Sequence, residues 1–335
     1  MTRLALATAL SALVVAGCGA KATGPAARAC PAQPGGEVQL AGGEVILGAA
    51  GLHPEEGPPR AVAVGPFSID RTEVTNDQFA EFVAATGYVT MAERAPDPDL
   101  YPGVPPEALK PSSLVFVGAD AKADGDPAHW WRVVDGANWR HPEGPDSSIR
   151  GLGRHPVVHI GYEDALAYAR WRGRDLPTEA EWELAARGGL QGKTYEWGDT
   201  PPVPDAPRAN TWQGVFPAVD TADDGYRAQT APVGCFAPNG LGLSDMSGNV
   251  WEWTRDWYLP GHEHGDTGPD ADLAIDPADG TPKHVIKGGS FLCSDDFCLR
   301  YRPAARQAGP PDTGSSHIGV RTVRRGQEAG SPPSG

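Results

Sequence analysis

The residues best suited to chemistry are the cysteines, of which this 335-residue chain has five: Cys18, Cys30, Cys235, Cys293 and Cys298. Cys293 and Cys298 stand five positions apart with no histidine between them. In an exported protein, two nearby cysteines form a disulfide by default. Two soft thiolates also suit Cu(I), which prefers sulfur and low coordination, better than zinc, which takes four ligands. The residues alone therefore leave a disulfide and a copper site open.

The N-terminus has the pattern of a lipoprotein signal. Arg3 provides a positive start, Leu4 to Val15 is apolar but too short to span a bilayer stably, and Ala16-Gly17-Cys18 follows. We expect cleavage after residue 17 and a diacylglycerol on the Cys18 thiol; the alternative is an ordinary signal peptide with an incidental cysteine. Gly19, in place of Asp, favours the outer membrane in a Gram-negative bacterium. We therefore expect an exported, membrane-anchored lipoprotein on the periplasmic face.

Composition predicts a loop-rich globular domain. The 43 glycines and 34 prolines favour turns over long helices or strands, whereas ten tryptophans argue for a buried core and against disorder. The net charge of −15 argues against nucleic-acid binding, because that requires clustered Lys and Arg. We expect a flexible tether at 18–36, one domain at 37–325, a disordered tail at 326–335, and a monomer.

Local patterns predict a few short helices that must position the rest of the domain. Thr75 can cap a helix that buries Phe79. Thr178 and Glu181 form a capping box, in which each side chain satisfies the backbone N–H of the other residue. A further helix is expected over residues 162–171, and Pro177 separates it from the one that follows Thr178.

Five segments in order along the chain resemble signatures of the formylglycine-generating enzyme (sulfatase-modifying factor) family. They are Arg71-Thr72-Glu73-Val74-Thr75-Asn76, Gly136-Ala137-Asn138-Trp139-Arg140-His141-Pro142-Glu143-Gly144, Leu176-Pro177-Thr178-Glu179-Ala180-Glu181-Trp182-Glu183, Gly248-Asn249-Val250-Trp251-Glu252-Trp253, and Lys287-Gly288-Gly289-Ser290 with the following Arg300-Tyr301-Arg302. The resemblance covers residues 37–325. It implies an α+β, C-type-lectin-like fold with little regular secondary structure, but most of these signatures mark the fold and not the activity.

The resemblance is most specific around the cysteine pair. The segments Gly288-Gly289-Ser290-Phe291-Leu292-Cys293 and Phe297-Cys298-Leu299-Arg300-Tyr301-Arg302 look like the active-site segment of active members, and many divergent relatives lack both cysteines. This implies that Cys293 and Cys298 bind Cu(I), that the substrate cysteine adds as a third sulfur ligand, and that O2 is reduced there. The implied substrate is a cysteine in a Cys-x-Pro-x-Arg segment of an unfolded sulfatase.

The resemblance also implies roles for residues around the cysteines. Ser290 would position oxygen or water, and Trp251 would wall the oxygen pocket unless it is only a core aromatic residue. The chain departs from the family at three positions: Ser294 stands where active members tend to have His, Phe297 where they have Tyr, and His317 where an Asn helps to bind substrate. These departures, at Phe297 and His317 in particular, concern substrate binding more than metal binding.

Two calcium sites are implied by the same resemblance. The first would use side-chain oxygens of Asn210 and Asp224 with carbonyls of Thr211 and Tyr226. The second would use carboxylates of Asp245 and Glu252 with carbonyls of Met246, Gly248 and Val250. Hard oxygen ligands of this kind suit Ca²⁺, which would order chain that lacks regular hydrogen bonding. Without the resemblance, these residues are ordinary turn and surface acids.

Three classes of function remain in competition. The first is a copper oxidase that makes formylglycine, and the second is a non-catalytic lipoprotein that binds an envelope peptide, protein or glycan. The third is an iron enzyme related to the ergothioneine-pathway sulfoxide synthases, but His262 and His264 are too close together to form its three-histidine motif. Retention of both Cys293 and Cys298 favours the first. Cys30 and Cys235 either pair or stay separate, which the sequence does not decide.

Overall fold

The structure is a computed structural model that describes residues 30, 35–100, 102–118, 126–203, 206–259, 262, 276 and 280–326. The expected signal peptide, the lipid-attachment residue Cys18, most of the expected tether and residues 327–335 lie outside this set. Among the described residues, no helix combines the length and the apolar character that crossing a membrane requires.

The described residues form three α-helices: α1 (Asn76–Thr86), α2 (Tyr162–Trp171) and α3 (Glu179–Ala186). Both predicted caps are present. The Thr75 hydroxyl accepts a hydrogen bond from the Gln78 amide at 3.3 Å, and the Thr178 hydroxyl accepts one from the Glu181 amide at 3.1 Å. Glu181 in turn accepts from the Thr178 amide at 2.7 Å. The predicted helix over residues 162–171 is confirmed as α2.

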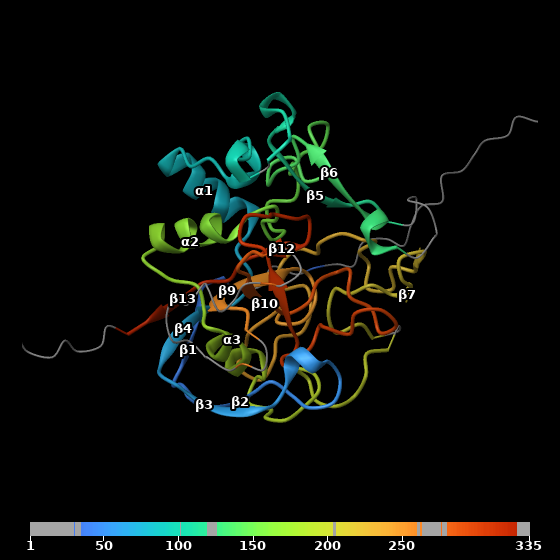
Figure 1. The fold of residues 1–335 in the computed structure, drawn as a ribbon. Helices are drawn as coiled ribbons and strands as arrows, with labels where there is room; N and C mark the ends of the chain where they lie inside the picture. The colour runs from blue at the N-terminus through green and yellow to red at the C-terminus, as the bar shows by residue number, and fades with distance from the viewer. Residues whose placement is uncertain are drawn as a thin grey trace, which may run out of the picture.

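The strands form two small sheets and three hairpins (Figure 1). A three-stranded antiparallel sheet has the order β1 (Glu37–Leu40), β4 (Phe67–Asp70), β13 (Val323–Arg325), and a four-stranded sheet has the order β11 (Arg306–Gly309), β10 (His284–Lys287), β9 (Trp251–Trp257), β12 (Ile318–Gly319). The hairpins are β2 (Gly43–Leu47) with β3 (Arg60–Val64), β5 (Ser112–Phe116) with β6 (Trp131–Asp135), and β7 (Gly214–Val215) with β8 (Val219–Asp220). Short 3-10 turns lie at Pro54–Glu56, Met91–Glu93, Pro98–Leu100, Pro106–Ala108 and Pro127–Trp130.

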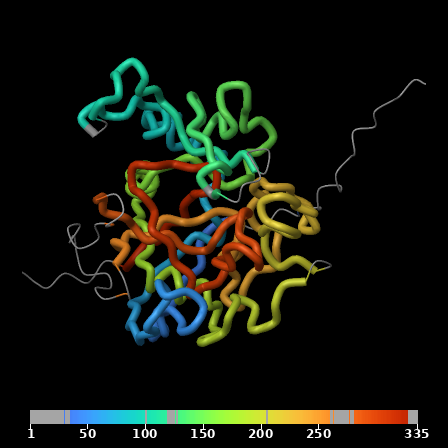
Figure 2. Tube along the Cα trace, turned by 45° about the vertical axis from the view of Figure 1, so that its right-hand side comes forward, coloured from blue at the N-terminus to red at the C-terminus, as the bar shows by residue number. Residues whose placement is uncertain are grey.

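Regular elements are short, and loops make up most of the described chain. The longest described helix, α1, has 11 residues, and the longest described strand, β9, has seven. In Figure 1 the four-stranded sheet lies in the middle, with α1, α2 and the β5–β6 hairpin on one side and α3, β1, β2 and β3 on the other. The C-terminal segment, orange to red in Figure 2, crosses this middle layer. The predicted mixed, loop-rich architecture is therefore confirmed.

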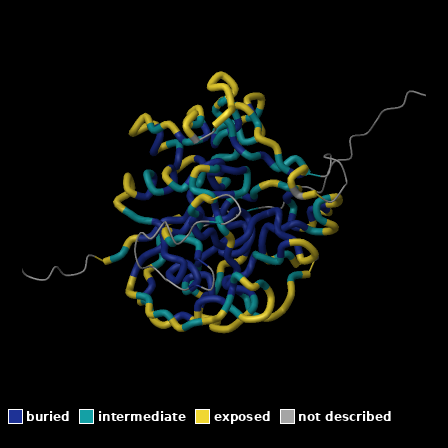
Figure 3. Tube along the Cα trace, in the orientation of Figure 1, coloured by how far each residue is buried: buried dark blue, intermediate teal, exposed yellow. Residues whose placement is uncertain are grey.

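The core follows the same layering, with buried residues concentrated in the middle of the molecule (Figure 3). One apolar cluster includes Phe79, Trp253 and Tyr301 together with both Cys293 and Cys298. A second cluster, around Trp182 and Val323 among others, packs α3 against the three-stranded sheet. Because the cysteine pair belongs to the first cluster, core packing fixes its surroundings.

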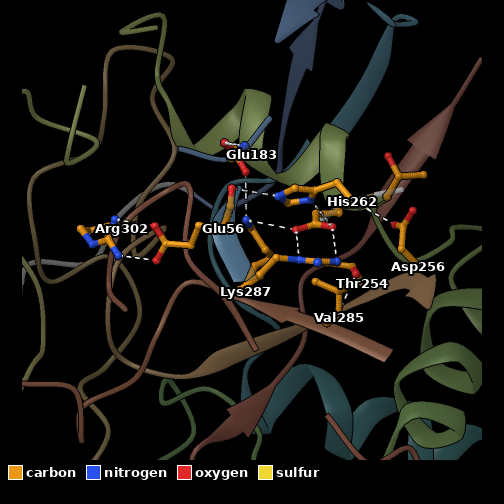
Figure 4. Close-up of polar contacts among 12 residues, drawn as sticks. Glu56, Glu183, Thr254, Asp256, His262, Val285, Lys287 and Arg302 are labelled. Atoms are coloured by element: carbon orange, nitrogen blue, oxygen red, sulfur yellow. Dashed lines mark hydrogen bonds and ion pairs between the residues drawn. The ribbon is translucent and has the colours of Figure 1, made fainter. Parts of the chain in front are cut away.

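A buried ion-pair network joins α3 to β10 and β11 (Figure 4). Lys287, at the end of β10, is fully buried, and its ammonium lies 2.9 Å from Glu183 and 3.5 Å from Glu179. Arg306 donates to both Glu179 oxygens at 2.9 and 3.0 Å, and Arg187 pairs with Glu183 at 2.6 Å. Burial alone would raise the pKa of Glu179, but Arg306 and Lys287 hold it well below its ordinary range.

We predict that Lys287→Met destabilises the fold by about 3 kcal/mol, the lower end of the range for a broken buried pair, because Glu179 keeps Arg306 and Glu183 keeps Arg187. The matched control is Lys110→Met. Lys110 pairs with Asp135 at the surface, where both side chains are about 60% exposed (60% and 61%), so its loss should cost under about 1 kcal/mol. Urea unfolding of both variants measures this difference. Similar small losses in the two variants would contradict the importance given to the buried network.

Candidate active site

A pocket of about 490 Å³ is lined by all six residues that the sequence predicts to act on substrate: Ser290, Cys293, Cys298, Trp251, Phe297 and His317. Trp251 comes from the start of β9, and His317 immediately precedes β12. The other four lie in the loop between β10 and β11. Two neighbouring strands and one long loop therefore bring the predicted residues together.

The sulfur atoms of Cys293 and Cys298 lie side by side and are bonded to each other in the structure, with 5.0 Å between the two Cα atoms. Both residues are buried, with 2% and 8% of their surfaces exposed. The Cys293 amide donates to the Ser290 carbonyl at 2.9 Å, and the Cys298 amide donates to the Ser294 carbonyl at 3.2 Å. After reduction, this pair fits a two-coordinate soft ion such as Cu(I), because both donors are sulfur and already adjacent.

Two glycines allow the chain to make this loop. Gly289 has a φ of +74°, and a Cβ added there would lie 2.9 Å from the Arg300 carbonyl oxygen and from the Tyr301 backbone. Gly288 has a φ of +97°, and its added Cβ would lie 3.1 Å from the Trp182 ring. Only glycine tolerates both the dihedral angle and the contact. Gly289 therefore lets the segment before Ser290 lie against the segment after Cys298, and Gly288 lets it lie against Trp182 of α3.

Ser290 is fully buried and bonds to His317. Its Oγ lies 3.1 Å from Nδ1 of His317 and accepts a hydrogen bond from the Leu292 amide at 3.2 Å. Burial, with a smaller effect of the nearby His159, lowers the pKa of His317 to about 3, so the imidazole is neutral at ordinary pH. The expected role of Ser290 toward oxygen or water stays a prediction, and the contact seen here is to the imidazole.

Aromatic side chains form the remainder of the pocket. Trp251 lines the pocket and also belongs to the main core cluster, so both sequence interpretations apply to it. Phe297 is 51% exposed and packs against Phe216 and Trp130, with ring centroids 4.5 and 5.2 Å apart. The pocket is also lined by three residues that the sequence did not predict: Trp130, Trp131 and Phe216. The adjacent tryptophans were a usable signal, whereas nothing in the sequence marks Phe216.

The first expected calcium set is close together in the structure. The amide oxygen of Asn210 is buried and has no hydrogen-bond partner among the described residues. Asp224 accepts hydrogen bonds from the Thr211 amide at 3.2 Å and the Tyr226 amide at 2.9 Å, while Gln213 donates to the Thr211 carbonyl. Burial raises the pKa of Asp224 to about 6. The unpartnered oxygen and the buried carboxylate fit a hard cation.

The second expected calcium set, which also includes Met246, Gly248 and Val250, is already partly neutralised. Both Glu252 oxygens accept hydrogen bonds from Arg321 at 3.0 Å, and Trp182 donates to one of them at 2.7 Å. Asp245 accepts from the Gly234 amide at 2.6 Å, and burial raises its pKa to about 6. Glu252 is therefore held by Arg321, and Asp245 is the acid of this set that most needs a cation.

Two further acids, which the sequence did not predict to be part of a site, belong to this region. Glu73 and Glu196 are buried, each has one oxygen without a hydrogen-bond partner among the described residues, and each interacts electrostatically with Asp245 and Glu252. Burial, followed by Asp245, raises the pKa of both glutamates well above the ordinary range. Four carboxylates facing one Arg321 favour an added cation or bound protons.

The structure also decides the pairing that the sequence left open. Cys30 and Cys235 form a disulfide with 4.8 Å between their Cα atoms, and the Tyr226 hydroxyl donates to the Cys235 sulfur at 3.4 Å. Within the described ranges, no group of three or more His, Cys, Asp or Glu side chains is arranged to hold a metal. The expected copper set and the second calcium set each contain two such side chains, and the first calcium set contains one, so this observation does not test them.

Comparisons with known proteins identify the family. A family model described as the sulfatase-modifying factor enzyme 1-like domain matches residues 23–326. The chain is 49% identical to the formylglycine-generating enzyme of Mycobacterium tuberculosis, over 85% of this chain and 96% of that protein. It is 40% identical to inactive C-alpha-formylglycine-generating enzyme 2 of Mus musculus, over 85% and 84%. Among solved structures, PvdO from Pseudomonas aeruginosa matches with a TM-score of 0.58 at 24% identity, over 86% and 94%, which supports the fold alone.

The layered fold and the pocket with paired sulfurs define an α+β domain of the sulfatase-modifying factor type. The chain belongs to the formylglycine-generating enzyme family, and it is an enzyme of the oxidoreductase class. The fold that the sequence resemblance implied is therefore confirmed.

We predict that calcium stabilises the native state through Asp224 and Asn210. An ion that binds only the folded chain adds about 2.7 kcal/mol when its concentration is 100 times Kd, so chelation should lower the melting temperature. Asp224→Asn should remove most of this calcium effect. The adjacent exposed Asp223→Asn is the matched control and should keep it. A calcium effect that is absent in the wild type, or equal in both variants, would contradict this first site.

Proposed function

We propose that this protein oxidises a cysteine in a Cys-x-Pro-x-Arg segment of an unfolded exported sulfatase to Cα-formylglycine, using O2 and one Cu(I) held by Cys293 and Cys298. The observation that carries the proposal is the pair of adjacent buried sulfurs in a pocket that also contains Ser290 and Trp251. The high identity to curated formylglycine-generating enzymes supports the same conversion.

The residues of the chain prepare the pocket for a substrate thiol. Trp251, Trp131 and Ile318 provide apolar walls that exclude water from the sulfur pair. The exposed Phe297, backed by Phe216, offers an aromatic surface at the pocket for an extended peptide. When bound by the two thiolates, Cu(I) supplies the redox chemistry toward O2 that amino-acid side chains lack.

We predict that the reduced protein binds one Cu(I) per chain and that Cys293→Ser or Cys298→Ser abolishes tight binding. Each substitution leaves the ion only one of two soft ligands. Cys235→Ser is the matched control, since Cys235 pairs with Cys30 outside the pocket lining, and it should retain copper. The copper-loaded wild type, incubated in air with a Cys-x-Pro-x-Arg peptide, should form an aldehyde, detected by mass loss and hydrazine capture.

A second candidate function has its own support. The sulfurs of Cys293 and Cys298 are bonded to each other, and Ser294, Phe297 and His317 depart from the active-member pattern. A pair that resists mild reductant and binds no copper after reduction would favour a non-catalytic lipoprotein that binds an envelope peptide, protein or glycan. Copper binding without turnover would keep the metal site and attribute the loss of activity to these three residues.

We further propose that the protein is a lipid-anchored monomer, exported to the periplasmic face of the outer membrane. Its support is the signal pattern that ends at Cys18. Cys18→Ala should move the protein from the membrane fraction to the soluble fraction, because the acyl chains provide the attachment. Cys30→Ala is the control and should stay in the membrane fraction. Unchanged membrane retention of Cys18→Ala would contradict the anchor.

A further inference from the structure

The His317 ring is held on several sides within the pocket. Its Nδ1 faces the Ser290 hydroxyl at 3.1 Å, and its ring centroid lies 4.7 Å from that of Trp131. The His317 backbone carbonyl accepts a hydrogen bond from the Trp251 amide at 2.9 Å. A ring that is fixed by its backbone hydrogen bond, by the tilted contact with the Trp131 ring and by the contact with Ser290 presents its remaining nitrogen in one direction.

The hydrogen bonds of Ser290 determine which nitrogen of the neutral His317 imidazole carries the proton. The Ser290 oxygen already accepts from the Leu292 amide, and within the described part of the chain its own proton has one acceptor, Nδ1 of His317. Because Ser290 is fully buried, a hydroxyl proton without an acceptor would be costly, and we therefore assign the hydroxyl as the donor to Nδ1. A neutral imidazole that accepts at Nδ1 carries its proton on Nε2. No described residue forms a hydrogen bond with Nε2, and Nε2 is not among the buried polar atoms that lack a partner. This nitrogen is therefore accessible in the pocket that His317 lines.

We propose that His317 is a neutral hydrogen-bond donor to the substrate, with Ser290 as its positioning residue, and that Nε2–H binds the main-chain carbonyl on one side of the reacting cysteine. This inference rests on the proposed function, because it names how the same pocket recognises its peptide. In this proposal, Ser290 orients the imidazole of His317 through its hydrogen bond to Nδ1.

The chemistry of the pocket favours a carbonyl as the acceptor. An extended peptide that enters an apolar pocket loses water from its carbonyl groups, and each buried carbonyl then requires a donor. Arg300, the cationic side chain that lines the pocket, already donates to Glu55 at 2.6 Å. A neutral N–H satisfies a carbonyl without placing another charge beside the sulfur pair.

Peptide binding to the full-length, reduced, copper-free protein tests the proposal without turnover. The probe is a fluorescent Ser-x-Pro-x-Arg peptide, in which serine replaces the reacting cysteine, read by anisotropy. His317→Phe keeps an aromatic ring beside Trp131 but removes both ring nitrogens, including the donor. It should weaken binding roughly 5- to 150-fold, the range for a buried acceptor left without its donor.

A double-mutant cycle identifies the partner of the histidine. In two further probes, an alkene isostere replaces one or the other amide bond that flanks the serine. One isostere should weaken binding to the wild type by the same factor as His317→Phe and should have no added effect on that variant. Effects that multiply for both isosteres would overturn the carbonyl contact.

Two readouts separate this inference from the proposed function. If the wild type forms formylglycine but His317→Phe has unchanged peptide affinity and KM, the inference fails and the function stands. If the wild type converts no cysteine peptide, the function fails. In wild-type protein, ¹⁵N NMR of His317 should show the proton on Nε2, and Ser290→Ala should lose this fixed preference. A proton on Nδ1 in the wild type would overturn the assignment, whatever the stability of the variants.

Discussion

The ion pairs of Lys287 with Glu179 and Glu183 are the constraint on which the pocket depends. Lys287 ends β10, and the next residues form the loop that carries Ser290 and the cysteine pair. Buried charges tolerate few arrangements, because each must keep its partner at contact distance. Glu179 also accepts hydrogen bonds from Arg306 on β11. The buried ion pairs therefore link α3, β10 and β11 to one another. The loop therefore starts from a fixed point.

From that fixed point, close packing builds a site out of distant parts of the chain. Gly289 lets the loop approach Tyr301, and the strand contact between Trp251 and His317 sets the opposite wall. Trp131 arrives from a separate hairpin. Because none of these segments forms the pocket alone, the site exists only in the complete fold. Looser packing in any of these layers would change the surroundings of Cys293 and Cys298.

Sequence reasoning succeeded where the physics is local. The caps at Thr75 and Thr178 depend on residues three positions away, and the composition alone predicted short elements. The sequence did not predict the hydrogen bond between Ser290 and His317, which are 27 residues apart. It also did not predict that Glu73 belongs to the buried acidic cluster. Such contacts depend on how layers meet and on which way a side chain faces, and neither has a period or a spacing in the sequence.

The Cys30–Cys235 disulfide joins residues 205 positions apart and changes how the chain bears tension. β1 is an edge strand that begins at Glu37, shortly after Cys30, and it pairs only with β4 among the described strands. A pull on the preceding chain would otherwise peel β1 from its neighbour one hydrogen bond at a time. With the covalent link present, the load enters the body of the domain at Cys235, and the strand that begins the fold carries none of it.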